Sequence, residues 1–243
     1  MIVQTAAQAY AKYREALAHD ALTQNAWHRE EDGRQLACVL GVLGDEVKEP
    51  RDCPAQIMPR WLAQMVPWFF DGMEFDDAKS WGLKFYEQID CLNGVIPFVV
   101  IHDWHATVVG PLAIEVAQKK KRNVAAQEAL ADMHRRAASG EKFTAEEWRP
   151  LLKIAFKDAY ADAYVNAYAN ADAYADVYAD AYANANADAY VNAYANAYAY
   201  AYADADAYAN ANANAYAKKQ SIKRLADGMV ACLARVALNG EKL

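Results

Sequence analysis

The chain has 243 residues, 55% of them hydrophobic, which is enough to bury one large core or two small ones. Its formal net charge is −7, whereas proteins that bind nucleic acid directly usually carry an excess of basic residues, so direct nucleic-acid binding is disfavoured. No apolar run reaches the roughly 20 residues of a membrane span, and we expect no secretory signal in the first residues. The four cysteines are widely spaced, which favours reduced thiols over a disulfide framework. We therefore expect a cytoplasmic protein that binds neither membranes nor nucleic acid directly.

Apolar residues recur at helical spacing through much of the chain outside one repetitive tract. Asp32-Gly33 is expected to end a helix, and three prolines favour short helices entered at proline. Thr144 and Glu147 have the Thr-x-x-Glu spacing of a capping box at the start of a long helix. The expected helices lie at Val3 to Leu22, Gln35 to Leu43, Asp76 to Ile89, Asn123 to Ala138 and Lys218 to Ala237.

A strict two-residue repeat occupies Asp158 to Ala217. Every odd position is Ala or Val, and every even position is Tyr, Asn or Asp. The tract carries a charge of −8, so the rest of the chain sums to +1 and the net acidity belongs to the repeat. The codons of Asp, Asn and Tyr differ in the first base, and those of Ala and Val in the second. The repeat therefore also has the form of an expanded hexanucleotide unit that has drifted.

Alternation of this kind is formally typical of a strand, but the residues favour a helix. Ala is the best helix former, Ala, Asn and Asp are poor strand residues, and no Gly or Pro supplies the corners of a β-solenoid. At about 100° per residue, six tyrosines share one face of a helical wheel, and five aspartates lie across from them. The tyrosines are Tyr160, Tyr164, Tyr168, Tyr174, Tyr178 and Tyr182; the aspartates are Asp158, Asp162, Asp172, Asp176 and Asp180.

The tyrosine face shifts after the tyrosine-free stretch Asn184 to Asp188, which favours a helix–helix connection there over a continuous rod. The sequence thus predicts an all-α protein with a helical globular N-terminal body, followed by long Ala/Tyr/Asp/Asn repeat helices that form a hairpin or a rod. Composition divides it into residues 1–143 as the body, 144–217 as the repeat helices and 218–243 as a C-terminal amphipathic helix.

His102 and His105 form a His-x-x-His pair on a predicted helix. Two histidines at this spacing share a helix face and could bind a metal with a carboxylate such as Glu115 or Asp90. The pattern lacks the His-Glu-x-x-His form and a second ligand set, so buried helix histidines are the favoured interpretation and a metal-dependent hydrolase is an alternative. We assign no catalytic residue, no metal ligand and no cofactor.

Two stretches carry a resemblance: DGRQLACVLG with DCPAQIMPRWLAQMVPWFFDG, and GEKFTAEEWRPLLKIAFKDAYADAY running into the repeat. They resemble alanine-rich hypothetical proteins of phages and bacterial mobile elements, some with tails like those of putative immunity proteins. This chain has Tyr and Asn where those tails commonly have Trp and Arg. The resemblance implies a setting of conflict between mobile elements and their hosts, and no activity.

We therefore expect a non-enzymatic protein-binding factor, either a phage-type inhibitor of a host defence protein or an immunity factor. Its binding surface would be the five aspartates of the repeat. A sharper version is nucleic-acid mimicry toward a nucleic-acid-binding defence protein, because aspartates four residues apart are about 6 Å apart along a helix. The main alternative is a structural homo-oligomer assembled through the tyrosine face.

Overall fold

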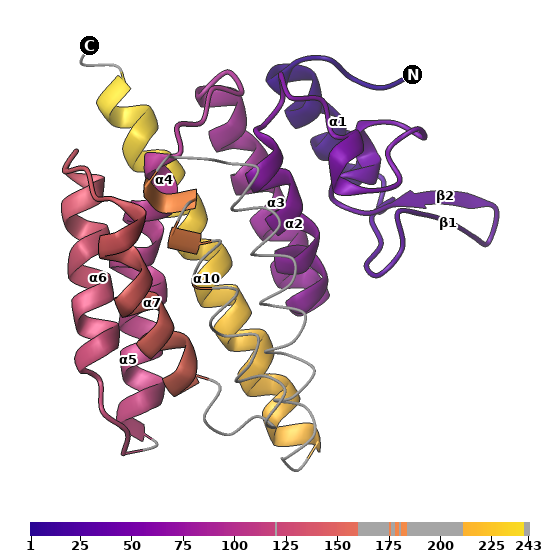
Figure 1. Cartoon of the computed structure of the whole chain (residues 1–243). Helices are drawn as coiled ribbons and strands as arrows, with labels where there is room; N and C mark the ends of the chain where they lie inside the picture. The colour runs from indigo at the N-terminus through magenta and orange to yellow at the C-terminus, as the bar shows by residue number, and fades with distance from the viewer. Residues whose placement is uncertain (120, 160–174, 176–177, 180, 184–210, 241–243) are drawn as a thin grey trace. The chain divides into compact units, whose positions relative to one another are not determined.

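The computed structural model describes the chain except residues 120, 160–174, 176–177, 180, 184–210 and 241–243 (Figure 1). The chain folds into two compact units. Unit 1 contains Met1–Pro97 together with Tyr216–Leu243, and unit 2 contains Phe98–Ala215. The packing thus divides the chain at different positions from the composition, because the segment after the repeat joins the N-terminal residues in one unit.

Unit 1 is built on the helices α1 (Ala6–Ala18), α2 (Arg60–Gly72) and α3 (Phe75–Cys91), together with α10 (Ala211–Gly240) from Tyr216 onward. Its core is aromatic, and the polar atoms of the buried rings are satisfied by backbone carbonyls. The Tyr13 hydroxyl donates to Lys79 O at 3.0 Å, and the Trp81 indole donates to Ala226 O on α10 at 2.9 Å. These bonds fix the rings in a dry core, where an unpaired polar atom would be costly.

Close helix packing in unit 1 depends on two glycines. A Cβ at Gly72 would lie 2.5 Å from Ile222 Cδ1 of α10, and one at Gly82 would overlap the Tyr13 hydroxyl of α1. Glycine at these positions lets α10 approach α2, and α1 approach α3, more closely than any other residue would allow.

A β-hairpin interrupts the helices of unit 1, formed by β1 (His28–Glu31) and β2 (Arg34–Ala37). The turn residues Asp32 and Gly33 both have positive φ, at 52° and 72°, as a two-residue type I′ turn requires. The expected helix at Gln35 to Leu43 is therefore wrong: its first residues belong to β2, and its last form the 3₁₀ turn η1 (Gly41–Leu43). Asp-Gly between two short strands closed a hairpin instead of ending a helix.

The proline-rich stretch of unit 1 also differs from expectation. A 3₁₀ turn, η2 (Pro50–Asp52), precedes it, and Pro59 is the N-cap of α2, as a proline entry predicts. Pro67, however, lies inside α2 and does not begin a new helix. Seven buried side chains of α2 outweigh the one backbone hydrogen bond that the proline removes.

Unit 2 begins with one continuous helical path made of α4 (Val99–Trp104), η3 (His105–Val109) and α5 (Gly110–Lys119). The middle segment, η3, is a π-helical turn. Helix α6 (Ala125–Ala138) packs against all three, and a Cβ at Gly110 would lie 2.7 Å from Ala131 Cβ of α6. Helix α7 (Ala145–Ala159) packs on α6 and begins with the predicted capping box, in which Thr144 N donates to Glu147 Oε2 at 2.7 Å.

The protein is mostly helical, which confirms the coarse prediction, but the hairpin of unit 1 corrects the expectation of a purely all-α fold. Most of the repeat lies outside the described residues, so whether it forms a hairpin or a rod stays a prediction. Among the helices that the structure describes, none combines the length and apolar character needed to cross a membrane.

We expect Gly82→Ala to destabilise unit 1 by about 1–3 kcal/mol, because the new methyl group would force Tyr13 out of its position. Thermal unfolding of the full chain measures the effect, with Lys84→Ala at an exposed position of the same helix as the control. In a Tyr13→Leu background the cost of Gly82→Ala should shrink. An equal cost in both backgrounds would contradict the proposed overlap.

Candidate functional site

The two histidines singled out from the sequence meet a third in the core of unit 2. His102 lies near the end of α4, His105 begins the π-helical turn, and His134 lies on α6. His102 is 7% exposed and His134 is 1% exposed, whereas His105 keeps part of its surface accessible. Trp148 of α7 and Tyr182 surround the three imidazoles, and both are buried. We call these five residues the histidine cluster.

Two hydrogen bonds connect the histidine cluster. His102 Nδ1 and His134 Nδ1 are 3.1 Å apart, so one of the two nitrogens carries the proton and the other accepts it. The Tyr182 hydroxyl lies 3.2 Å from His105 Nε2. The first bond joins α4 to α6, and the second joins the π-helical turn to Tyr182, which comes from the repeat.

Ring stacking holds the same residues face to face. The His105 and His134 rings are nearly parallel with centroids 4.4 Å apart, and the His102 and Trp148 rings are nearly parallel at 5.7 Å. Tyr182 meets His134 edge to face at 4.7 Å. His105 and His134 therefore contact each other through their ring faces.

Burial keeps these imidazoles neutral. It lowers the pKa of His102 to about 4, and burial together with the neighbouring His102 lowers the pKa of His105 to about 3. The pKa of His134 is lowered well below its usual range by burial first, and then by His105 and His102.

Three buried polar side-chain atoms in unit 2 lack a hydrogen-bond partner within the described part of the chain, and two of them belong to the histidine cluster. They are His134 Nε2, Trp148 Nε1 and Gln127 Oε1, of which the last lies two helical turns before His134 on α6. Each such atom costs about 1–3 kcal/mol when buried. The cluster is therefore polar and internally incomplete, which sets it apart from the satisfied aromatic core of unit 1.

The histidine cluster is a packed set of neutral imidazoles that contact one another through a hydrogen bond and ring stacking. Within the described residues, no group of three or more His, Cys, Asp or Glu side chains is arranged to hold a metal ion. Glu115, one of the carboxylates considered from the sequence, pairs with Lys119 at 2.7 Å. Asp90, the other, belongs to α3 in unit 1.

The tyrosine face is described at two of its six positions. Tyr178 is 3% exposed and Tyr182 is 5% exposed, and their rings lie 5.6 Å apart. Asp158 belongs to α7 by its backbone. The remaining predicted residues lie outside the described residues: Tyr160, Tyr164, Tyr168, Tyr174, Asp162, Asp172, Asp176 and Asp180.

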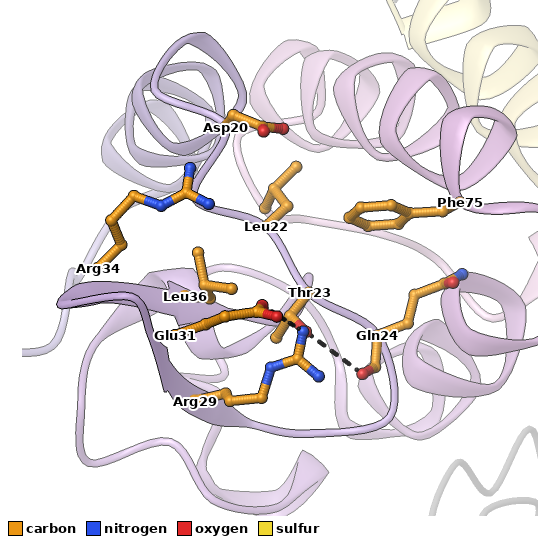
Figure 2. Close-up of a pocket in the computed structure, with 9 residues that line it drawn as sticks. All are labelled: Asp20, Leu22, Thr23, Gln24, Arg29, Glu31, Arg34, Leu36 and Phe75. Carbon is orange, nitrogen blue, oxygen red and sulfur yellow. Dashed lines mark hydrogen bonds and ion pairs between the residues drawn. The ribbon is translucent and has the colours of Figure 1, made fainter.

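Unit 1 contains a surface pocket of about 330 Å³ beside the hairpin. Figure 2 shows the Phe75 ring directed toward Leu22 across the hollow, with the Arg29–Glu31 ion pair on the hairpin side. Asp20 and Arg34 complete the charged rim, so positive and negative side chains are equal in number. A rim of balanced charge gives no preference for an anionic or a cationic ligand.

A second hollow of about 470 Å³ lies on the other face of the same hairpin. Successive side chains of a strand point to opposite faces of the hairpin, which explains why there are two hollows. Arg29 and Glu31 line the first hollow, whereas His28 and Gln35 line the second. The second hollow also contains Glu15 and Lys12, which form an ion pair with each other at 2.8 Å. Neither hollow brings together the groups of a catalytic site.

Sequence reasoning identified His102 and His105 but missed His134 and Trp148. His134 stands 29 positions after His105, and no spacing rule connects the two. The chain matches no protein-family model, no curated protein and no solved structure. What the cluster does must therefore be argued from its own residues.

Removing the Tyr182 hydroxyl should destabilise unit 2. We expect Tyr182→Phe to cost about 1 kcal/mol, because it removes the partner of His105 Nε2, and Tyr182→Ala to cost about 3–5 kcal/mol by leaving a cavity. Chemical unfolding measures both, with Tyr216→Phe as the control because Tyr216 is 62% exposed. The assignment fails if Tyr182→Phe is as harmless as Tyr216→Phe.

Elemental analysis tests the hydrolase alternative. We expect no stoichiometric zinc or iron, because His102 and His105 are engaged with His134 and Tyr182. About one metal per chain that disappears in the double variant His102→Ala, His105→Ala would revive that alternative.

Proposed function

We propose that the protein is a non-enzymatic protein-binding factor that presents the acidic side of its repeat to a basic partner. The partner class that fits is a nucleic-acid-binding protein, whose basic surface would take the aspartates in place of phosphates. The resemblance to proteins of mobile elements supports a setting in which such a factor inhibits a defence protein or protects against one.

The observation that carries the proposal is the burial of Tyr178 and Tyr182. Tyr182 belongs to the histidine cluster and the Tyr178 ring packs beside it, so at these two positions the tyrosine face is used for packing inside unit 2. On the helical wheel of the sequence, Asp172, Asp176 and Asp180 lie across from these tyrosines. If the tyrosine side is covered, the acidic side is the one that a partner can reach.

Charge distribution supports the same surface. The repeat carries −8 and the rest of the chain sums to +1, so long-range attraction to a basic partner would originate in the repeat. The described ion pairs on the surfaces of both units pair acids with nearby bases, as in Lys12–Glu15 and Arg135–Asp132. Locally balanced pairs of this kind contribute little to steering.

The same observation weakens the homo-oligomer alternative. Two of the six tyrosines that would form its interface are already buried within one chain. The alternative now depends on Tyr160, Tyr164, Tyr168 and Tyr174. Light scattering of the full chain tests it, and we expect the mass of a monomer.

The acidic surface can be tested by neutralising it. We expect changing Asp158, Asp162, Asp176 and Asp180 together to Asn to abolish partner binding and leave the helical content unchanged, because Asn has nearly the same size. The measurement is affinity capture from the native host's lysate, followed by mass spectrometry, at about 0.1 M and 0.5 M salt. The wild-type complex should weaken at the higher salt, where charges are screened over a shorter distance.

A matched control removes four charges elsewhere. The variant Glu30→Gln, Asp32→Asn, Asp45→Asn, Glu87→Gln changes exposed acids of unit 1. It should recover the same partner as the wild type, which separates a specific acidic surface from net charge. Recovery of that partner by the variant with four repeat aspartates changed would overturn the proposal.

A further inference from the structure

We propose that the histidine cluster is an acid-sensitive switch: as the pH falls, His102, His105 and His134 take up protons together, and Tyr178 and Tyr182 are released from unit 2. The inference concerns the conformation of unit 2 and does not depend on the acidic-surface proposal. It rests on the way the rings are arranged around a single shared proton.

The first step is the bond between His102 Nδ1 and His134 Nδ1. At 3.1 Å it has room for one proton. The pair can accept a first additional proton on an outer Nε2 atom with this bond intact. A second would place N–H groups on both facing nitrogens, which breaks the bond and separates α4 from α6.

The second step is the position of His105. Its ring is stacked on His134 at 4.4 Å, so charge on either ring directly opposes charge on the other. Its Nε2 atom also contacts the Tyr182 hydroxyl, which links its state to the repeat. Protonation of the cluster is therefore coupled to the position of Tyr182.

The third step is the electrostatic environment of the imidazoles. Burial lowers the pKa of all three histidines, and the neighbouring imidazoles lower the pKa values of His105 and His134 further. The acids on the surrounding helices pair with bases of their own helix at Glu115–Lys119, Asp132–Arg135 and Glu146–Arg149. The other charged residues of α4, α6, α7 and the connection after α6 are Asp103, Glu128, Arg136 with Glu141, Lys142, Glu147, Lys153, Lys157 and Asp158. Asp176 and Asp180, next to the tyrosines in the sequence, lie outside the described residues.

The direction of the pH effect follows from these shifts. A histidine whose pKa is lower in the folded than in the unfolded state binds its proton more readily when unfolded. Its stabilising contribution is complete above about pH 6.5 and is lost as the pH falls toward about 4 and 3, the folded values of His102 and His105. Unit 2 should therefore open in that window.

The number of protons can be measured on the intact wild-type chain. Hydrogen exchange followed by mass spectrometry, corrected for intrinsic rates and run from pH 7.5 to 4.5, gives protection factors for each unit. One proton taken up on opening changes the opening equilibrium tenfold per pH unit, and three change it by up to about a thousandfold. We expect α6, α7 and the peptide with Tyr178 and Tyr182 to lose protection more than tenfold per pH unit, while α2 and α3 change less.

Histidine variants test whether the protons taken up on opening bind to the histidine cluster. His134→Gln and His102→Gln should each reduce the slope in α6 and α7, and His19→Gln, at an exposed position in unit 1, should leave it unchanged. Replacing Asp176 and Asp180 with Asn should also leave it unchanged. If the histidine variants fail to fold, the wild-type slope still decides: tenfold or less per pH unit, or an equal slope in both units, overturns the switch.

Discussion

One proton held between His102 Nδ1 and His134 Nδ1 is the constraint on which unit 2 depends. Two neutral imidazoles can face each other in a dry core only with one donor and one acceptor, so the bond fixes a tautomer as well as a distance. Trp148 and Tyr182 then cover the pair, and their rings exclude the water that would otherwise stabilise a charged form. Helices α4 and α6 are joined by a polar contact that persists only while one of the two facing nitrogens is unprotonated.

The π-helical turn gives this arrangement its local geometry. It begins at His105, directly after α4, and its wider winding changes the angular register of α5 relative to α4. Gly110 then lies against Ala131, close enough that a side chain would not fit. The same turn thus places His105 beside His134 and lets the path into α5 remain in contact with α6. In unit 1, Gly72 and Gly82 likewise allow helices to approach closely, and the described core there contains no buried histidine.

Much of the helical structure was predictable, because amphipathic periodicity and caps are local signals. The Thr144–Glu147 capping box and the helix at Asp76 to Ile89 were confirmed in this way. The hairpin was missed because Asp32-Gly33 ends helices and closes hairpins alike, and the strands on either side are short and charged. His134 could not be predicted, since helix packing brought it to His102 across 32 positions. A pair at helical spacing is visible in a sequence, whereas a partner from another helix is not.

Unit 1 is made from two separated parts of the chain, and Trp81 reaches its acceptor only when Ala226 of α10 has been synthesised. The residues between these two parts include the repeat. A two-residue unit is encoded by six bases, so the gain or loss of whole units keeps the reading frame and α10 is still translated. A slip of one or two bases would instead delete α10 and leave the N-terminal core unfinished. The core of unit 1 is therefore completed only when the reading frame is kept through the repeat, whatever the side chains of the repeat bind.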